Sequence, residues 1–126
     1  MSEKTIAEKL LLKPGRRLLV LNAPAGYLER IGPLPDFARI VEPAESADVI
    51  QLFIYSLTDL DSKLPETVPL VKDETIFWIC YPKKFRSLQT EIDRNILYTY
   101  IGLKGWKGIG MISVDNNWSA MRIKPQ

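Results

Sequence analysis

The sequence contains no histidine and a single cysteine, Cys80, among its 126 residues. Without histidine, both the commonest general base at neutral pH and the commonest metal ligand are missing. One cysteine allows no intramolecular disulfide, and zinc sites built from Cys and His ligands are excluded. Any chemistry would have to depend on carboxylates, lysines, tyrosines or a cofactor. The composition therefore favours a non-catalytic protein over an enzyme.

Long apolar runs and a strong charge of either sign are also missing. No segment approaches the roughly 18 apolar residues of a membrane-spanning helix, and the N-terminus lacks the apolar stretch of a signal peptide. The 17 basic and 15 acidic residues leave a formal charge of +2, which does not favour nucleic acid as a partner. We therefore expect neither a membrane nor a nucleic-acid partner, and the single cysteine, Cys80, suits a reduced, cytoplasmic setting.

The segment TIFWICYPKK, residues 75–84, is the most informative part of the chain. It is apolar without alternation until it ends in Tyr81, Pro82 and two lysines, which is typical of a central strand buried on both faces. Such strands belong to α/β sheets covered by helices. With a length of 126 residues and a hydrophobic fraction of 46%, the sequence predicts a single α/β domain over residues 1–126.

The remaining patterns predict strands that alternate with helices. Thr5-Ile6-Ala7-Glu8 is a capping box that opens a short N-terminal helix at 5–12. Ser87 is expected to cap the longest helix, 88–103, whose inward stripe would be Leu88, Ile92, Ile96, Tyr100 and Leu103. Strands are predicted at 17–22, 37–42, 48–55, 75–81, 108–114 and 118–124.

These elements predict a three-layer α/β/α architecture with a mainly parallel sheet. Right-handed crossovers restrict the strand order, and we expect 2-1-3-4-6-5. Asp115-Asn116-Asn117 suits a tight turn, so the last two strands should form an antiparallel hairpin. The final strand would then run back between the fourth and the fifth.

Ligands of such sheets bind at the carboxyl ends of the strands, and several segments should meet there. Lys83 and Lys84 would contact a phosphate or carboxylate, although a solvated loop that ends an apolar strand explains them as well. Cys80 is expected to be an inert core thiol. No catalytic residue or metal ligand is predicted. The candidate ligand-binding residues are Asn22, Gly26, Tyr27, Ser56, Tyr81, Lys83, Lys84, Asp115 and Trp118.

The turn NAPAGY, residues 22–27, lies where nucleotide-binding folds place a glycine-rich loop. It has one glycine, and Pro24 lacks an amide hydrogen that could reach a phosphate. A modified ligand loop and a plain strand-to-helix connection therefore both remain open. The same holds for Asp115 and Trp118, which suit either a ligand or a turn with a packed indole.

Four motifs occur in order along the chain: LLVLNAPAGY, ADVIQLFIYS, IFWICYPKK and VDNNWSAMRI. Together they resemble a family of small bacterial proteins of unknown function that share NAP-x-G-[FY], YPK and WSA-[LM]-R motifs. This resemblance extends from Lys13 onward and implies no activity, cofactor or catalytic residue. More distantly, the arrangement looks like a pared-down methyltransferase domain of the Rossmann type. That resemblance implies a methyl donor at the first loop and an acid after the second strand, here Glu42, for its ribose.

Three functions follow as hypotheses. The first is a non-catalytic domain that binds a small anionic ligand or a protein partner at the carboxyl-end rim of the sheet. The alternative is a minimal or degenerate transferase that uses a nucleotide-derived cofactor near residues 22–27. The third is a structural subunit that associates with itself through an apolar surface. No cofactor is firmly implied by the residues themselves.

Overall fold

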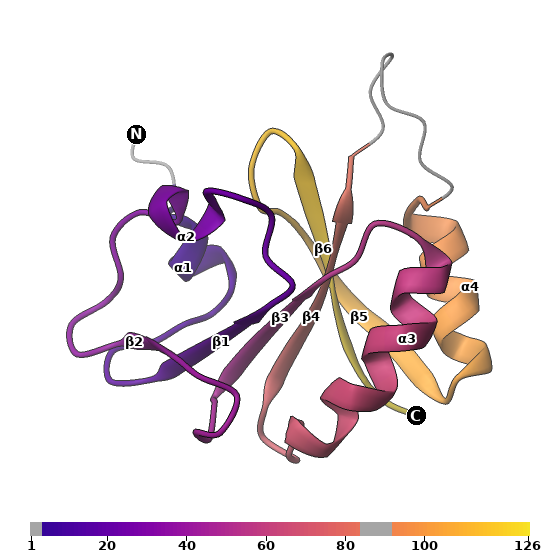
Figure 1. Cartoon of the computed structure of the whole chain (residues 1–126), viewed down its shortest axis with the longest axis horizontal. Helices are drawn as coiled ribbons and strands as arrows, with labels where there is room; N and C mark the ends of the chain where they lie inside the picture. The colour runs from indigo at the N-terminus through magenta and orange to yellow at the C-terminus, as the bar shows by residue number, and fades with distance from the viewer. Residues whose placement is uncertain (1–3, 84–91) are drawn as a thin grey trace.

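The computed structural model describes residues 4–83 and 92–126, and they form a six-stranded sheet with helices on both faces (Figure 1). The strand order is β2-β1-β3-β4-β6-β5, which confirms the predicted order. The first four strands of this order are parallel, and β6 runs antiparallel between β4 and β5. The strands are β1 (Arg17–Leu21), β2 (Arg39–Val41), β3 (Val49–Phe53), β4 (Ile76–Pro82), β5 (Trp106–Ser113) and β6 (Trp118–Pro125).

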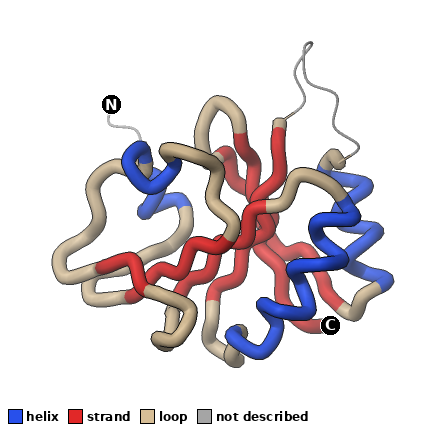
Figure 2. Tube along the Cα trace, in the orientation of Figure 1, coloured by secondary structure: helices blue, strands red, loops and turns tan. Residues whose placement is uncertain are grey.

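The helices divide between the two faces of the sheet, as Figure 2 shows. Helices α3 and α4 lie on one side, and the short helices α1 and α2 lie on the other (Figure 1). Each side buries its own apolar cluster. Ile79 and Leu97 belong to the cluster beneath α3 and α4, the α3/α4 cluster, and Trp78 and Trp118 belong to the one on the opposite side, the α1/α2 cluster. The helical segments are α1 (Ile6–Lys9), α2 (Tyr27–Arg30), α3 (Leu57–Thr67), the 3-10 turn η1 (Val68–Leu70) and α4 (Arg94–Leu103).

The capping box of α1 is confirmed, but the helix is shorter than the predicted 5–12. The Thr5 amide donates to Glu8 Oε1 at 2.8 Å, and the Glu8 amide donates to Thr5 Oγ1 at 3.1 Å. The helix ends at Lys9, and Leu11 then takes a left-handed backbone with φ of 68°. This conformation turns the chain toward β1.

The two central strands are buried as predicted, and one of them carries a polar residue. All five residues of β3 are buried, including Gln51. Each polar atom of its amide has a partner, because Tyr27 Oη donates to Gln51 Oε1 at 3.0 Å and Gln51 Nε2 donates to Cys80 Sγ at 3.5 Å. Burial raises the pKa of the Cys80 thiol, which agrees with an inert core cysteine.

The predicted helix 88–103 needs correction where the structure describes it. Helix α4 begins at Arg94, and Asp93 is its N-cap, with Oδ1 accepting from the Ile96 amide at 2.8 Å. Ser87 and Leu88 lie outside the described residues. The predicted inward stripe is wrong at Ile96 and Leu103, which are exposed, and the buried residues of α4 are Leu97 and Ile101. It is right at Ile92, which is buried before the helix, and at Tyr100, which packs partly buried against the same cluster.

The predicted edge strand 37–42 is shortened to β2. Phe37 lies before it in a turn that the Ala38 amide closes by donating to the Pro35 carbonyl at 3.0 Å. Its φ of 64° is left-handed, so Phe37 cannot continue a strand. The expected alternation of Phe37 with its neighbours on one face of a strand is therefore wrong.

Candidate functional site

The carboxyl ends of β1 and β3 meet at the start of α3, as predicted. Asn22 takes a left-handed φ of 59°, and its Nδ2 donates to the Phe53 carbonyl at 2.9 Å and to Asp59 Oδ2 at 3.4 Å. Ser56 is the N-cap of α3, its Oγ accepting from the Asp59 amide at 3.0 Å. Both predicted residues are therefore at the rim, and both already bond to the protein.

Tyr27 and Trp118 were predicted to contact a ligand, but they lie inside the α1/α2 cluster. Tyr27 is fully buried, and burial raises the pKa of its hydroxyl. Its ring packs edge-on against Phe53 at 4.7 Å, and Phe53 packs against Trp118 at 4.9 Å between ring centroids. Because α2 begins directly after the turn, its first side chain points into the core. Neither residue offers a stacking surface to a ligand here.

In the turn NAPAGY, a side chain covers the only glycine. Gly26 has a φ of 79°, and a Cβ built there would lie 2.9 Å from Arg30 Nη1. Arg30 Nη1 donates to the Ala25 carbonyl at 3.1 Å, so the guanidinium occupies the space above the glycine. The geometry therefore favours the strand-to-helix connection over the open phosphate loop.

Lys83 lies at the rim where β4 ends, and a second lysine joins it. Lys83 Nζ donates to Ser113 Oγ at 2.6 Å, and Lys9 Nζ donates to the Ser113 carbonyl at 2.9 Å. Within residues 4–83 and 92–126, neither ammonium group has a carboxylate within 4.0 Å. Lys84 lies outside the described residues. Lys9 was not predicted, because nothing in the sequence indicates that α1 lies beside the end of β5.

Asp115 and Tyr81 serve the structure of the rim. Asp115 Oδ1 accepts from the amides of Asn117 at 2.8 Å and Trp118 at 2.9 Å, which closes the β5–β6 hairpin. Tyr81 is buried on the α3/α4 side, where its Oη lies 3.9 Å from Met111 Sδ. Burial raises the pKa of the Tyr81 hydroxyl. The hydroxyl is therefore neutral at physiological pH.

A hollow of about 300 Å³ opens beside the ends of β1 and β3. It lies at the junction of β1 and β3, where the sheet changes direction because β2 is added on one side and β3 on the other. Glu42, exposed just beyond β2, precedes one of the lining residues. The lining residues are Leu21, Asn22, Pro43, Leu52, Lys63, Glu66, Thr67 and Leu70.

Of these lining residues, sequence reasoning named Asn22 alone and missed the wall that α3 contributes. The spacing of Leu60 and Leu64 was the available signal. Both are buried against the sheet together with Thr67, which places Lys63 on the adjoining side of the helix. The sequence does not give the rotation of α3 about its own axis, and this rotation decides which side of the helix faces β1.

Two features are missing from the described residues, a metal-binding group and a membrane-spanning helix. Residues 4–83 and 92–126 contain no group of three Cys, Asp or Glu side chains placed to hold a metal ion. In the same residues, no helix combines the length and the apolar character needed to cross a membrane.

No family model and no curated protein matches the sequence. Solved structures do match it in fold. DhpI in complex with SAH is 9% identical, with 96% of this chain and 82% of that chain covered at a TM-score of 0.57. The tRNA methyltransferase TrmK of B. subtilis is 9% identical, with 97% and 64% covered and a TM-score of 0.54. The ribosomal protein L11 methylase of Lactobacillus delbrueckii subsp. bulgaricus is 13% identical, with 96% and 75% covered and a TM-score of 0.53.

Identities this low show the fold alone. The chain has the Rossmann-like α/β fold of these proteins, so the resemblance to a methyltransferase domain is confirmed for the fold. The resemblance to the small bacterial family, which rests on motifs, stays a prediction. Activity and ligand have to be argued from the site.

Proposed function

We propose that the chain is a reduced domain of the methyltransferase fold that binds a nucleoside in the hollow between β1, β3 and α3. The nucleoside would be the adenosyl part of S-adenosylmethionine or of its product, S-adenosylhomocysteine. The observation that carries this proposal is the position of the hollow at the change of direction in the sheet. Structural neighbours in the same fold are seen with SAH.

The lining of the hollow suits a nucleoside. Leu21, Leu52 and Leu70 offer an apolar surface to a flat base. Glu42 stands at the edge with its side chain exposed, where a carboxylate can accept hydrogen bonds from ribose hydroxyls. A volume of about 300 Å³ is at the lower end of the range for small-molecule sites, roughly 300–1,000 Å³. That size favours a nucleoside over a larger cofactor.

The amino-acid part of the methyl donor fits less well. Its usual cradle is a glycine-rich first loop, whereas this turn has Gly26 covered by Arg30 and a proline without an amide hydrogen. The Asn22 amide is held by the Phe53 carbonyl. The proposed function is therefore binding of the nucleoside, without transfer of the methyl group. The residues of this chain bind and orient the nucleoside.

Isothermal titration calorimetry with adenosine, S-adenosylmethionine and S-adenosylhomocysteine tests the proposal. We expect all three to bind with dissociation constants within a few-fold of one another, because the amino-acid part adds few contacts. Glu42→Gln should weaken each by about tenfold or more, since a hydrogen bond to a charged group contributes roughly 1.5–3 kcal/mol. Glu29→Gln, an exposed change on α2, is the matched control and should bind as the parent does.

Two results would contradict this function. If none of the three compounds releases or absorbs heat at millimolar concentration, the hollow does not bind a nucleoside. If S-adenosylmethionine binds a hundredfold more tightly than adenosine, the first loop does hold the amino-acid part, and the domain is not reduced in the sense proposed.

A second candidate function is supported by the lysines around Ser113. Lys9 and Lys83 come from α1 and the end of β4, and both ammonium groups reach this one exposed residue. Two cations without a carboxylate partner among the described residues provide a site for a small anion such as phosphate. This corresponds to the sequence-based hypothesis of an anionic ligand at the rim, with Lys9 added.

Titration with pyrophosphate, followed by amide chemical shifts, tests this second candidate. The resonances of Ser113 and its neighbours should shift at low salt, and the apparent affinity should fall as sodium chloride is added. The Lys9→Ala/Lys83→Ala variant should lose the shifts. Lys107→Ala, an exposed change on β5, should keep them. Equal shifts in the double variant would show that the two lysines do not form the site.

A further inference from the structure

Phe37 combines two unfavourable properties. It is 92% exposed, the highest value for a large apolar side chain among the described residues. Its backbone is also left-handed, with φ of 64°, at a turn position that normally carries glycine or asparagine. An exposed ring gains nothing from packing in the monomer, and the backbone is strained. Neither property is explained by the fold of a single copy.

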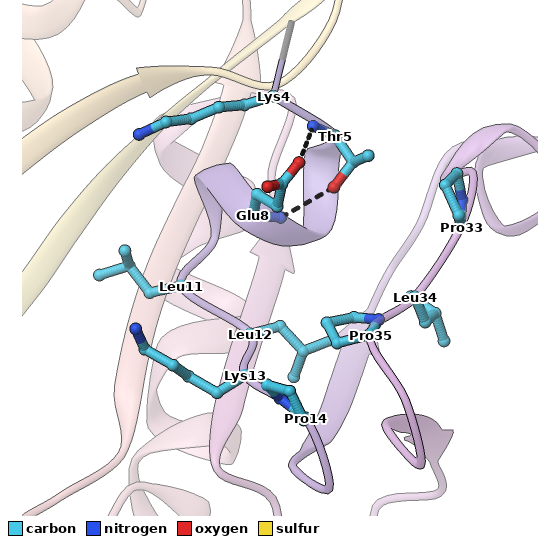
Figure 3. A pocket seen from close by; sticks show the side chains of 10 residues that line it. All are labelled: Lys4, Thr5, Glu8, Leu11, Leu12, Lys13, Pro14, Pro33, Leu34 and Pro35. Carbon is cyan, nitrogen blue, oxygen red and sulfur yellow. Dashed lines mark hydrogen bonds between the residues drawn. The ribbon is translucent and has the colours of Figure 1, made fainter. Parts of the chain in front are cut away.

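A pocket of about 530 Å³ lies beside the turn that carries Phe37 (Figure 3). As Figure 3 shows, α1 and residues 11–14 form one side, and residues 33–35 form the other. Its walls include three prolines, which have no amide hydrogen to offer a polar ligand. Leu11, the other exposed apolar residue with a left-handed backbone, also lines it. An aromatic side chain suits this lining.

The anchor and the pocket belong to one short stretch of the chain. Pro35 lines the pocket and begins the turn in which Phe37 stands. The Gly15 amide donates to the Asp36 carbonyl at 2.8 Å, which attaches this turn to the chain just after Pro14, another lining residue. A two-fold axis can therefore bring each Phe37 to the pocket of the other copy in a single self-complementary contact.

The charges on this stretch are complementary in the same arrangement. Lys13 lines the pocket, and Asp36 directly precedes Phe37. In residues 4–83 and 92–126, neither of them forms an ion pair within 4.0 Å. Glu8, the acid of the pocket, has its carboxylate bonded by Thr5, which lowers the pKa of Glu8. An Asp36 that enters with Phe37 would thus meet Lys13 of the second copy.

We propose that the chain forms a symmetric dimer in which Phe37 of each copy enters the pocket between residues 11–14 and residues 33–35 of the other. The partner is a second copy of this chain, because Phe37 and Asp36 directly follow the lining residue Pro35, and Lys13 lines the same pocket. This inference is independent of the nucleoside hollow, which is built from other residues.

Sedimentation equilibrium over a range of concentrations tests the dimer. The parent chain should dimerise, and Phe37→Asn should weaken the association about thirtyfold or more, as expected for an aromatic anchor. At dilutions where both are monomers, Phe37→Asn should melt at the same or a higher temperature, because asparagine tolerates the left-handed backbone. Leu103→Asn, an equally polar change at another exposed residue, should leave the dimer intact.

A charge exchange identifies the second copy as the partner. Lys13→Asp and Asp36→Lys should each be monomeric alone, because like charges would face each other at both contacts. An equimolar mixture of the two variants should dimerise, because each contact then pairs a lysine with an aspartate. A parent chain that stays monomeric at millimolar concentration would overturn the proposal. So would a Phe37→Asn variant that dimerises as the parent does, or a mixture that stays monomeric.

Discussion

Ile79→Asp should abolish folding. Ile79 is fully buried in β4, opposite Leu52 of β3 and Met121 of β6, and it belongs to the α3/α4 cluster. The substitution removes an apolar side chain and leaves a carboxylate without a partner in the core, which is among the costliest of changes. We expect a loss of about 4–5 kcal/mol or more, comparable with the roughly 5–15 kcal/mol that stabilise a typical domain.

The measurement is thermal unfolding followed by circular dichroism, with solubility as the first readout. The variant should be insoluble, or should show no cooperative transition. Ile109→Asp, at a residue of the outer strand β5 that is 41% exposed, is the control and should fold with a small change in melting temperature. A soluble Ile79→Asp protein with the parent melting temperature would contradict the assignment of β4 as a central buried strand.

Trp118→Ala should lower the free energy of unfolding by about 3–5 kcal/mol. Trp118 is buried at the start of β6, where its ring packs edge-on against Phe53 and, with centroids 5.2 Å apart, against Tyr55. Truncation would leave a cavity between these rings and remove contacts with a strand from the centre of the sheet. Urea unfolding monitored at the far-ultraviolet dichroism band gives the free energy directly.

Tyr55→Ala is the matched control, because Tyr55 touches the same indole while 52% of it is exposed. That change should cost less than about 1 kcal/mol, since about half of the residue was already exposed to water. If Trp118→Ala left the stability unchanged, the indole would not be part of the core, and the hypothesis of a ligand-stacking residue would return.

The sheet could be predicted because its signals are local. The apolar runs around Gln51 and Ile79 lack the alternation of a half-exposed strand, so both had to be central and parallel. Asp115 and the asparagines after it indicate the hairpin. The right-handed crossover rule then leaves few strand orders, and the predicted one is correct.

The inward face of α4 could not be predicted in the same way. Ile96 and Leu97 are adjacent, and so are Tyr100 and Ile101, which produces two apolar stripes of equal spacing on neighbouring sides of the helix. Packing against the sheet selects Leu97 and Ile101. That selection depends on how the helix is rotated about its axis against the sheet, and the spacing of apolar residues carries no such information.

The candidate site was partly predictable for a related reason. Parallel strands bring their carboxyl ends to one edge, so Asn22 and Ser56 were correctly expected near each other. An aromatic residue after a strand can turn either way, and Tyr27 points inward, where Gln51 accepts its hydroxyl hydrogen. No pattern along the chain pairs Tyr27 with a residue 24 positions away.

The buried amide of Gln51 also affects how the sheet assembles. Strands as uniformly apolar as β3 and β4 could slide along each other by two residues and still pack similar side chains. Such a slip would separate Gln51 from Cys80, and from Tyr27 as well if β3 is the strand that shifts; a buried polar group without a partner costs about 1–3 kcal/mol. One polar side chain in the middle of the core therefore makes misaligned pairings unstable and selects the native alignment as the strands come together.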